Sequence, residues 1–424
     1  MSIKVFKFGG ASLRDAENIR NVAAILQKFK SENILIVVSA MGKTTNALEE
    51  VIASYFERDG KAFDTLNSIR AKHEALIHEL MGNDAAVLAD INDILVEVEW
   101  ILEDEPHDAY DYIYDQIIAI GELISSKIVG AYLNKVGLST TWLDARDVLR
   151  TDETWREAVI DWKTTQYNAE TVVKPIFANY TEGSLFAITQ GFMGATKDNN
   201  TATLGREGSD YSASIFAHCL DAEAMFIWKD VSGVLSGDPR IFKDVVKLDN
   251  ISYEEAVEMT YYGATVVHPR TVQPLMAKKI PLYVRSFLDH DAVGTKISTE
   301  APPQYPPILM AERNQIFLKI ANPDFTFLVE SHIRDLFVIF VKYHIFVNLM
   351  QNSGAFFYVS ITHAPDREAE LMEELREKFT VEAIPNLDLF TARHPNGDAI
   401  SRLTEGKKVY FEKLIPQTYQ VLVG

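Results

Sequence analysis

The first segment whose residue types suit chemistry is Lys-Phe-Gly-Gly-Ala-Ser at residues 7–12, which joins an apolar run to a helical pattern. Its adjacent glycines let the backbone approach a ligand without a clash from a Cβ atom. The helix that follows presents unpaired N–H groups and the positive end of its dipole, which suit phosphate oxygens. Lys7 adds a cation. The spacing predicts a phosphate-binding turn, although an ordinary strand-to-helix turn with a surface lysine fits it equally well.

A second polar segment, Ser-Ala-Met-Gly-Lys-Thr-Thr-Asn at residues 39–46, follows the next apolar run. Its end resembles a P-loop, but the first glycine of that motif would fall at position 37, which is valine. The sequence therefore disfavours a P-loop. The hydroxyl and amide groups suit a small polar ligand, and they are also typical of a plain loop.

Two further segments combine glycines with charges. Gly-Arg-Glu-Gly-Ser-Asp at residues 205–210 runs into a helix and is suited to an anion-binding nest, in which Arg206 grips a carboxylate. The alternative is that Asp210 only caps the helix. The turn-rich loop at residues 228–240 is either a nucleotide-binding loop or a solvated connection. Its charged residues are Lys229, Asp230, Asp238 and Arg240.

Alternating strands and helices over residues 1–300 predict one α/β domain that positions these segments. Continuous apolar runs such as 3–8 and 34–38 are typical of strands buried on both faces of a parallel sheet. The pattern from about 47 to 135 is helical, which predicts an insertion. Further strands are expected at 140–143, 185–189, 224–228 and 282–286, and helices at 16–29, 211–220, 252–262 and 269–278.

The C-terminal third has a different pattern. A proline-rich stretch at 301–307 predicts a linker over residues 301–312. Residues 313–386 then follow the order βαββαβ, which is the ferredoxin-like arrangement. Residues 387–424 follow a shorter β-α-β-β order. We therefore expect one complete module and one trimmed module.

The chain of 424 residues carries 41 Lys and Arg against 60 Asp and Glu, a net charge of −19. This acidity argues against nucleic acid or an anionic membrane surface as a partner. Residues 90–122 hold eleven acids and no Lys or Arg, and Glu122 is the only one of them expected in a binding site.

The single cysteine, Cys219, excludes an intrachain disulfide, and no signal peptide is evident, so we expect a cytoplasmic location. No metal-ligand spacing and no nucleophile motif is present.

The order and spacing of these motifs resemble the amino-acid kinase family, and within it the aspartate kinases. The family's K-F-G-G-T-S is similar to residues 7–12, and its G-R-G-G-S-D to residues 205–210, where Glu207 replaces glycine. Its W-T-D-V loop is similar to residues 228–240, its G-A-K-V-L-H-P to residues 263–269, and a G-E pair to residues 121–122. The tail resembles ACT regulatory modules. The resemblance implies a mainly parallel sheet sandwiched by helices, followed by ferredoxin-like ACT modules.

The implied reaction transfers the γ-phosphoryl group of ATP to the β-carboxylate of L-aspartate, the first step towards lysine, threonine and methionine, with Mg²⁺ bridging the phosphates. Such transfer needs positioning and charge stabilisation rather than a protein nucleophile. By resemblance, Lys7 and Asp210 are catalytic, Arg206 holds a substrate carboxylate and Glu122 the α-ammonium group. The implied aspartate site also includes Ser39, Thr45, Gly208 and Ser209. The implied ATP site comprises Lys7, Gly9, Gly10, Ser12, Lys229, Asp230, Leu235, Asp238, Arg240 and Thr265.

Three positions of the implied nucleotide site depart from the family pattern. Lys229 stands where relatives often have threonine, Leu235 where they have tyrosine, and Thr265 where they have lysine. We expect Lys229 to supply the cation that position 265 lacks.

The tail is expected to make a homodimer, because ACT modules usually pair across chains, and to bind an amino-acid effector such as lysine or threonine. The expected effector residues follow an apolar strand, where a plain β-turn is the alternative: Asn348, Gln351, Asn352 and Ser353. Two other functions stay open, namely another amino-acid kinase, such as acetylglutamate kinase, and a non-catalytic amino-acid-binding regulator.

Overall fold

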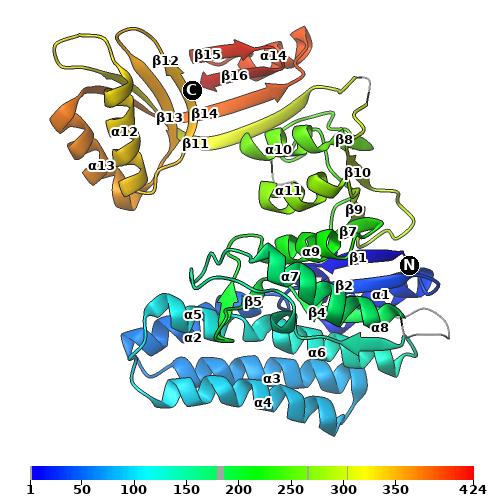
Figure 1. Ribbon diagram of the computed structural model, residues 1–424. Helices are drawn as coiled ribbons and strands as arrows, with labels where there is room; N and C mark the ends of the chain where they lie inside the picture. The colour runs from blue at the N-terminus through cyan, green and yellow to red at the C-terminus, as the bar shows by residue number, and fades with distance from the viewer. Residues whose placement is uncertain (1, 179–185, 265–266, 303) are drawn as a thin grey trace. The chain divides into compact units, whose positions relative to one another are not determined.

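The computed structural model describes residues 2–178, 186–264, 267–302 and 304–424 (Figure 1). The chain divides into two compact units. The first comprises Met1–Val234, Lys247–Tyr253 and Val267–Ala301, and the second Leu235–Val246, Glu254–Val266 and Pro302–Gly424. Two short segments of the region expected to form the first domain thus group with the C-terminal part. The predicted position 265 lies outside the described residues.

The first unit is built on an eight-stranded sheet with the order β3-β4-β2-β1-β7-β9-β10-β8. The first six strands in this order, β3, β4, β2, β1, β7 and β9, are parallel to one another. Strand β10 is antiparallel to β9 and parallel to β8. The central strands are almost wholly buried, as their continuous apolar runs predict. The strands are β1 (Ile3–Phe8), β2 (Asn33–Val38), β3 (Thr140–Trp142), β4 (Phe186–Gln190), β7 (Ala224–Lys229), β8 (Asn250–Ser252), β9 (Leu282–Ser286) and β10 (Thr295–Ser298).

Helices cover both faces of this sheet, which confirms the predicted α/β sandwich (Figure 1). Helix α9 contacts β1, β2 and β7, while α6 contacts β2, β3 and β4 on the other face. The predicted helical insertion consists of α2 to α6. The helices are α1 (Ala16–Lys28), α2 (Thr44–Glu57), α3 (Ala62–Met81), α4 (Ala85–Glu103), α5 (Tyr110–Ile118), α6 (Ile120–Lys135), α7 (Trp162–Asn168), α8 (Lys174–Ala178), α9 (Gly208–Cys219) and α11 (Pro269–Lys278).

Several short elements of the first unit have no counterpart in the sequence prediction. A two-stranded ribbon joins β5 (Met193–Ala195) to β6 (Thr201–Thr203), and single helical turns occur at Gly10–Leu13, Ala145–Asp147 and Ala169–Val173. These elements are too short to show a period in the sequence. The span Tyr110–Lys135 is long and apolar enough to cross a bilayer, but 83% of its most apolar window is buried inside the protein, as in a core helix.

The second unit contains a six-stranded antiparallel sheet with the order β12-β13-β11-β14-β16-β15. The chain order from β11 to β14 is βαββαβ, which confirms the predicted ferredoxin-like arrangement. Helices α12 and α13 pack with this sheet around one apolar core that includes Leu318, Phe340 and Leu371. The elements are α10 (Tyr253–Tyr261), β11 (Ile308–Ala321), α12 (Glu330–Lys342), β12 (Val347–Asn352), β13 (Phe357–Thr362), α13 (Pro365–Lys378), β14 (Thr380–Arg393), α14 (Gly397–Thr404), β15 (Val409–Ile415) and β16 (Thr418–Val423).

The two expected modules share strands. Strand β14 is continuous through the expected boundary at residues 386 and 387, and β11 begins inside the expected linker. The Pro385-Asn386 pair is typical of a turn, but here it forms an irregularity within the strand, with Asn386 at φ 60° and a shift of register opposite Gln315 and Phe317. The Pro385-Asn386 pair therefore forms a bulge within β14 and does not separate two modules.

The trimmed module is completed from earlier in the chain. A small core around Phe390, Leu403 and Tyr419 also receives the side chains of Ile241 and Phe242, and the rings of Phe242 and Phe390 lie 6.0 Å apart. The segment Leu235–Val246 thus supplies apolar surface to this end of the sheet.

Helix α10 is held to β14 by a buried charge cluster. Arg393 donates to both carboxylate oxygens of Glu255, at 3.0 and 2.7 Å, and to Glu258 at 2.8 Å. A ring nitrogen of His394 lies 2.9 Å from Glu255. Burial alone would raise the pKa of Glu255, but the hydrogen bonds from Arg393 and His394 hold that pKa below its ordinary value.

We expect Arg393→Ala to lower the free energy of unfolding of this unit by about 3–5 kcal/mol, because it leaves the Glu255 carboxylate buried and short of partners. The matched control is Arg402→Ala, which breaks an exposed pair with Asp244 at 3.4 Å and is expected to cost less than about 1 kcal/mol. Urea unfolding followed by circular dichroism measures both. Equal losses in the two variants would show that the cluster contributes no more than a surface pair.

Candidate active site

The carboxyl ends of four parallel strands meet at one edge of the first unit's sheet. Phe8 of β1 is in register with Val38 of β2 and with Trp228 of β7, and Val38 is in register with Gln190 of β4. The residues that follow these strands therefore come side by side. Crevices at such edges are where open parallel sheets bind ligands.

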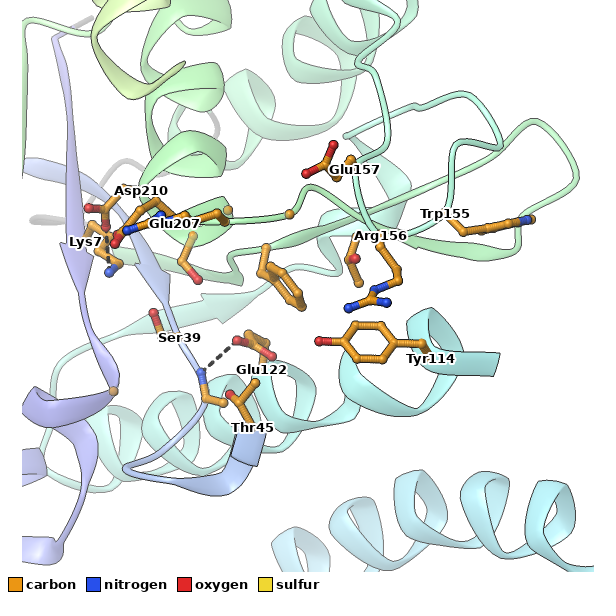
Figure 2. Close-up of a pocket in the computed structure, with 18 of the residues that line it drawn as sticks. Lys7, Ser39, Thr45, Tyr114, Glu122, Trp155, Arg156, Glu157, Glu207 and Asp210 are labelled. Atoms are coloured by element: carbon orange, nitrogen blue, oxygen red, sulfur yellow. Dashed lines mark hydrogen bonds and ion pairs between the residues drawn. The ribbon is translucent and has the colours of Figure 1, made fainter. Parts of the chain in front are cut away.

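A cavity of about 750 Å³ opens at this edge (Figure 2). Segments far apart in the sequence contribute to it: the turn after β1, the loop after β2, the start of α6 and the start of α9. The predicted site residues that line it are Lys7, Gly10, Ser39, Thr45, Glu122, Arg206, Gly208, Ser209 and Asp210. The structure thus brings the predicted catalytic pair and all six predicted aspartate-site residues to one cavity.

Lys7 and Asp210 form a buried ion pair within this cavity. The Lys7 Nζ atom lies 2.6 Å from Asp210 Oδ1, and the two side chains are only 10% and 3% exposed. Lys7 comes from the end of β1 and Asp210 from the first turn of α9, so the pair fixes the helix start against the strand. An ammonium group at a helix N-terminus is suited to stabilising negative charge on a bound group.

Glu122 brings a buried carboxyl group to the opposite wall. Its Oε1 accepts a hydrogen bond from the Ala40 backbone N–H at 3.1 Å, while Oε2 is buried with no hydrogen-bond partner. Burial raises the pKa of Glu122 to about 8, and the Ala40 hydrogen bond and the charge of Lys7 offset only part of that effect. The acid is placed to meet a cation or a hydrogen-bond donor on a ligand.

Close backbone approaches at this edge depend on glycines. A Cβ atom on Gly10 would lie 2.7 Å from the Ala40 carbonyl oxygen, so only glycine lets the two loops touch. A Cβ atom on Gly121 would lie 2.9 Å from the Ala40 Cβ, which explains how α6 brings Glu122 within reach of the Ala40 N–H. Close packing of α6 against Ala40 thus explains why a glycine precedes Glu122.

Arg206 and Glu207 lie at the exposed rim of the cavity. Glu207 precedes α9 at φ 55°, a left-handed conformation that favours glycine. Arg206 lines the cavity and lies near His268, where burial and the Arg206 charge lower the pKa of the histidine. An exposed guanidinium at the rim is suited to a bidentate grip on a carboxylate.

The remaining predicted nucleotide residues are placed differently. Gly9 and Ser12 belong to the turn after β1, while Lys229 is the last residue of β7 and Asp230 follows it at the same edge, outside the cavity lining. Leu235, Asp238 and Arg240 belong to the second unit, where Arg240 pairs with Asp238 at 2.7 Å. Thr265 lies outside the described residues, so its compensation by Lys229 stays a prediction.

The predicted effector residues occupy β12 and the turn after it. Asn348 donates to Gln315 at 2.9 Å and to Thr362 at 2.7 Å, across the sheet. Ser353 and Phe356 close the turn with backbone and hydroxyl hydrogen bonds. Gln351 and Asn352 are exposed. Their role as an effector site stays a prediction.

Sequence reasoning missed one wall of the cavity. It is formed by α5, by the loop between β3 and α7, and by Phe192 and Thr203 at the ribbon of β5 and β6, none of which carries a recognisable motif. The expectation that Glu122 is the only acid of the 90–122 run at the site is too narrow, because Asp111 also lines the cavity. The missed lining residues are Asp111, Tyr114, Thr154, Trp155, Arg156, Glu157, Phe192 and Thr203.

Among the described residues, no group of three or more His, Cys, Asp or Glu side chains is placed to hold a metal ion. Mg²⁺ in phosphoryl-transfer sites keeps several waters and is held by phosphates with one or two carboxylates. Asp210 in the first turn of α9 and Asp230, directly after β7, are the carboxylates that would hold such an ion together with the phosphates. The ion would neutralise phosphate charge there.

The arrangement can therefore hold a zwitterion and an anionic group together. Lys7 and the α9 N-terminus are suited to an anion, Glu122 to a cation, and Arg206 to a carboxylate.

The family comparison agrees with this geometry. Residues 2–286 match the amino acid kinase family, and the chain belongs to that family. Its curated relatives include bifunctional aspartokinase/homoserine dehydrogenase 1 of Arabidopsis thaliana, 36% identical over 301 residues, which are 69% of this chain. The match spans 32% of that relative, about a third of its length. Lysine-sensitive aspartokinase 3 of Escherichia coli K12 is 31% identical over 83% of this chain and 76% of its own.

Solved structures extend the likeness over both units. Escherichia coli aspartokinase III in complex with lysine and aspartate has a TM-score of 0.85 and 27% identity, covering 99% of this chain and 96% of its own. An aspartate kinase of Clostridium acetobutylicum, at 21% identity and a TM-score of 0.79, shares the fold over 99% of this chain and 96% of its own.

We expect Gly10→Ala to lower the free energy of unfolding by about 1–3 kcal/mol, because the added methyl group forces the Ala40 loop away. Gly9→Ala is the control, since its Cβ would meet only the flexible end of Lys7 at 3.4 Å. Thermal unfolding of both variants measures the difference. If the two variants unfold at the same temperature, the contact of Gly10 with the Ala40 loop does not constrain the site.

Proposed function

We propose that the chain is an aspartate kinase, which transfers the γ-phosphoryl group of ATP to the β-carboxylate of L-aspartate. The observation that carries this proposal is the cavity itself. It combines a buried Lys7–Asp210 pair beside a glycine turn with a buried, half-satisfied Glu122 and the guanidinium of Arg206. Few ligands other than an amino acid next to a phosphate group would use all of these groups.

In this proposal each group has one task. Arg206 binds the α-carboxylate and Glu122 binds the α-ammonium group, which leaves the β-carboxylate directed at Lys7. Ser39 and Thr45 complete the pocket with hydroxyl groups. Lys7 and the backbone N–H groups of the glycine turn and of α9 stabilise the charge that develops on the transferred phosphoryl group. Asp210 holds the Lys7 ammonium in place. The protein performs positioning and charge stabilisation, as phosphoryl transfer requires.

The nucleotide is proposed to lie over the turn after β1 and the loop after β7. Support comes from Escherichia coli aspartokinase III, which has also been solved in complex with aspartate and ADP and is 27% identical to this chain. We propose that Mg²⁺ binds together with the phosphates of the nucleotide.

Regulation and assembly belong to the same proposal. The similar Escherichia coli enzyme is lysine-sensitive and has been solved with lysine bound. We propose lysine as the first effector to test, followed by threonine, and a homodimer formed through the second unit. A cytoplasmic location is proposed from the single, buried Cys219.

An assay of ADP release tests the function directly. With Mg²⁺ and ATP, we expect turnover with L-aspartate and none above background with glutamate or N-acetylglutamate. Lys7→Met should lower kcat by at least about 10²-fold, since it removes one preorganised positive group from the transition state. Turnover with N-acetylglutamate would favour another amino-acid kinase. Aspartate binding by calorimetry without turnover would favour a non-catalytic regulator.

The pH dependence tests the role of Glu122. Its carboxyl group is protonated below a pKa of about 8 in the free protein, and it must lose that proton to pair with an ammonium group. We therefore expect kcat/KM for aspartate to fall about tenfold per pH unit below that pKa and to level off above it. Glu122→Gln should raise the aspartate KM and abolish this limb of the profile. If the limb persists in Glu122→Gln, another group titrates.

A further inference from the structure

Arg156 has a strained backbone in the cavity wall that the sequence did not reveal. Its φ is 68°, a left-handed conformation that residues with a Cβ atom disfavour. It lies in the stretch of residues 152–158, here called the wall segment, and its side chain lines the cavity with those of Thr154, Trp155 and Glu157 (Figure 2). Such strain persists only where the surroundings hold the residue firmly.

Helix α5 holds Arg156 at three points. The Arg156 backbone N–H donates to Asp115 Oδ2 at 3.0 Å, and its Nη1 lies 3.2 Å from Asp111 Oδ1. Its guanidinium carbon lies 4.3 Å from the centre of the Tyr114 ring, a cation–π contact. Main chain and side chain of one residue are thus fastened to a single helix.

The Asp115 carboxylate joins the wall segment to β6. Asp115 is fully buried, and it also accepts hydrogen bonds from the Thr203 N–H at 2.8 Å and from the Thr203 hydroxyl at 2.6 Å. Ala158 N–H in turn donates to the Thr203 carbonyl at 2.9 Å. Wall segment, α5 and β6 therefore form one connected network.

This network reaches the proposed aspartate-binding groups on two sides. A Cβ atom on Gly205 would lie 3.0 Å from the Arg156 carbonyl oxygen, so the wall segment packs directly on the residue before Arg206. On the other side, the Tyr114 hydroxyl donates to Glu49 at 3.0 Å, on the helix whose first turn carries Thr45. In Figure 2, Arg156 and Trp155 lie at one end of the pocket and Lys7 and Asp210 at the other.

We propose that Arg156 is a positioning residue for the amino-acid end of the cavity. By fastening the wall segment to α5, it holds Arg206 and Thr45 at the separation that aspartate requires. It does not act on the phosphoryl group, because it anchors the end away from Lys7. This inference rests on the proposed aspartate kinase function.

The test compares two arginines of the same backbone conformation. Arg58 has a φ of 57° and an exposed pair with Glu105 at 3.2 Å, but it ends α2 and does not line the cavity. Arg156→Gly and Arg58→Gly both relieve backbone strain and remove one ion pair, so both variants should fold. We expect Arg156→Gly to raise the aspartate KM at least about tenfold while kcat and the ATP KM stay within about threefold, and Arg58→Gly to change none of them.

Arg156→Lys is the rescue variant, because it keeps a cation near Asp111, whereas the backbone N–H that donates to Asp115 is present in both variants. Its aspartate KM should fall between those of the wild type and Arg156→Gly. An aspartate KM for Arg156→Gly within twofold of the wild type overturns the proposal. So does an equal rise in Arg58→Gly.

Amide hydrogen exchange keeps the test separate from the proposed activity. Without ligands, peptides covering residues 152–158 and 201–206 should exchange faster in Arg156→Gly than in the wild type or in Arg58→Gly. If the wild type shows no aspartate-dependent turnover but the exchange difference appears, the function fails, while the finding that Arg156 fastens the wall segment to α5 stands. Unchanged exchange in Arg156→Gly refutes the positioning role itself.

Discussion

The ion pair between Lys7 and Asp210 is the interaction on which the site depends. Two charges with side-chain exposures of 10% and 3% are costly to bury, and their mutual attraction offsets that cost only when they meet at close range. The 2.6 Å contact therefore requires β1 and the first turn of α9 to stay in fixed register. A pair of this kind adds little stability over apolar packing, so its value lies in placing one cation at a helix start.

The pair also bears on the charge of the cavity. Lys7 and Asp210 neutralise each other, and Glu122 is held mostly protonated at neutral pH by its burial. The other charged groups on the lining are Arg206, Glu207 and Glu157, together with Arg156, which pairs with Asp111. In the proposed function, an amino acid that brings its own ammonium group would favour the ionised form of Glu122.

The parts of this architecture that follow a period or a motif could be predicted from the sequence. The apolar runs identify β1, β2 and β7, and the order of the glycine segments places nine predicted residues around one cavity. What could not be predicted depends on contacts between distant segments. The turn signal at Pro385-Asn386 becomes a bulge because β11 continues to pair on both sides of it. Arg156 carries no motif, and its left-handed backbone exists only because Asp115, Asp111 and Tyr114 hold it.

The acids of residues 90–122 differ in their local contacts. A net charge of −19 does not favour the two anionic substrates of the proposed reaction, and the eleven acids of residues 90–122 first suggest a solvated helical surface. Three of them serve the site in different ways. Glu122 is buried, which raises its pKa to about 8. Asp115 is buried and accepts three hydrogen bonds, and Asp111 is exposed and pairs with Arg156. Burial and local partners, and not the regional charge, decide what each carboxylate does, because a desolvated acid responds to groups a few ångströms away while solvent screens the rest.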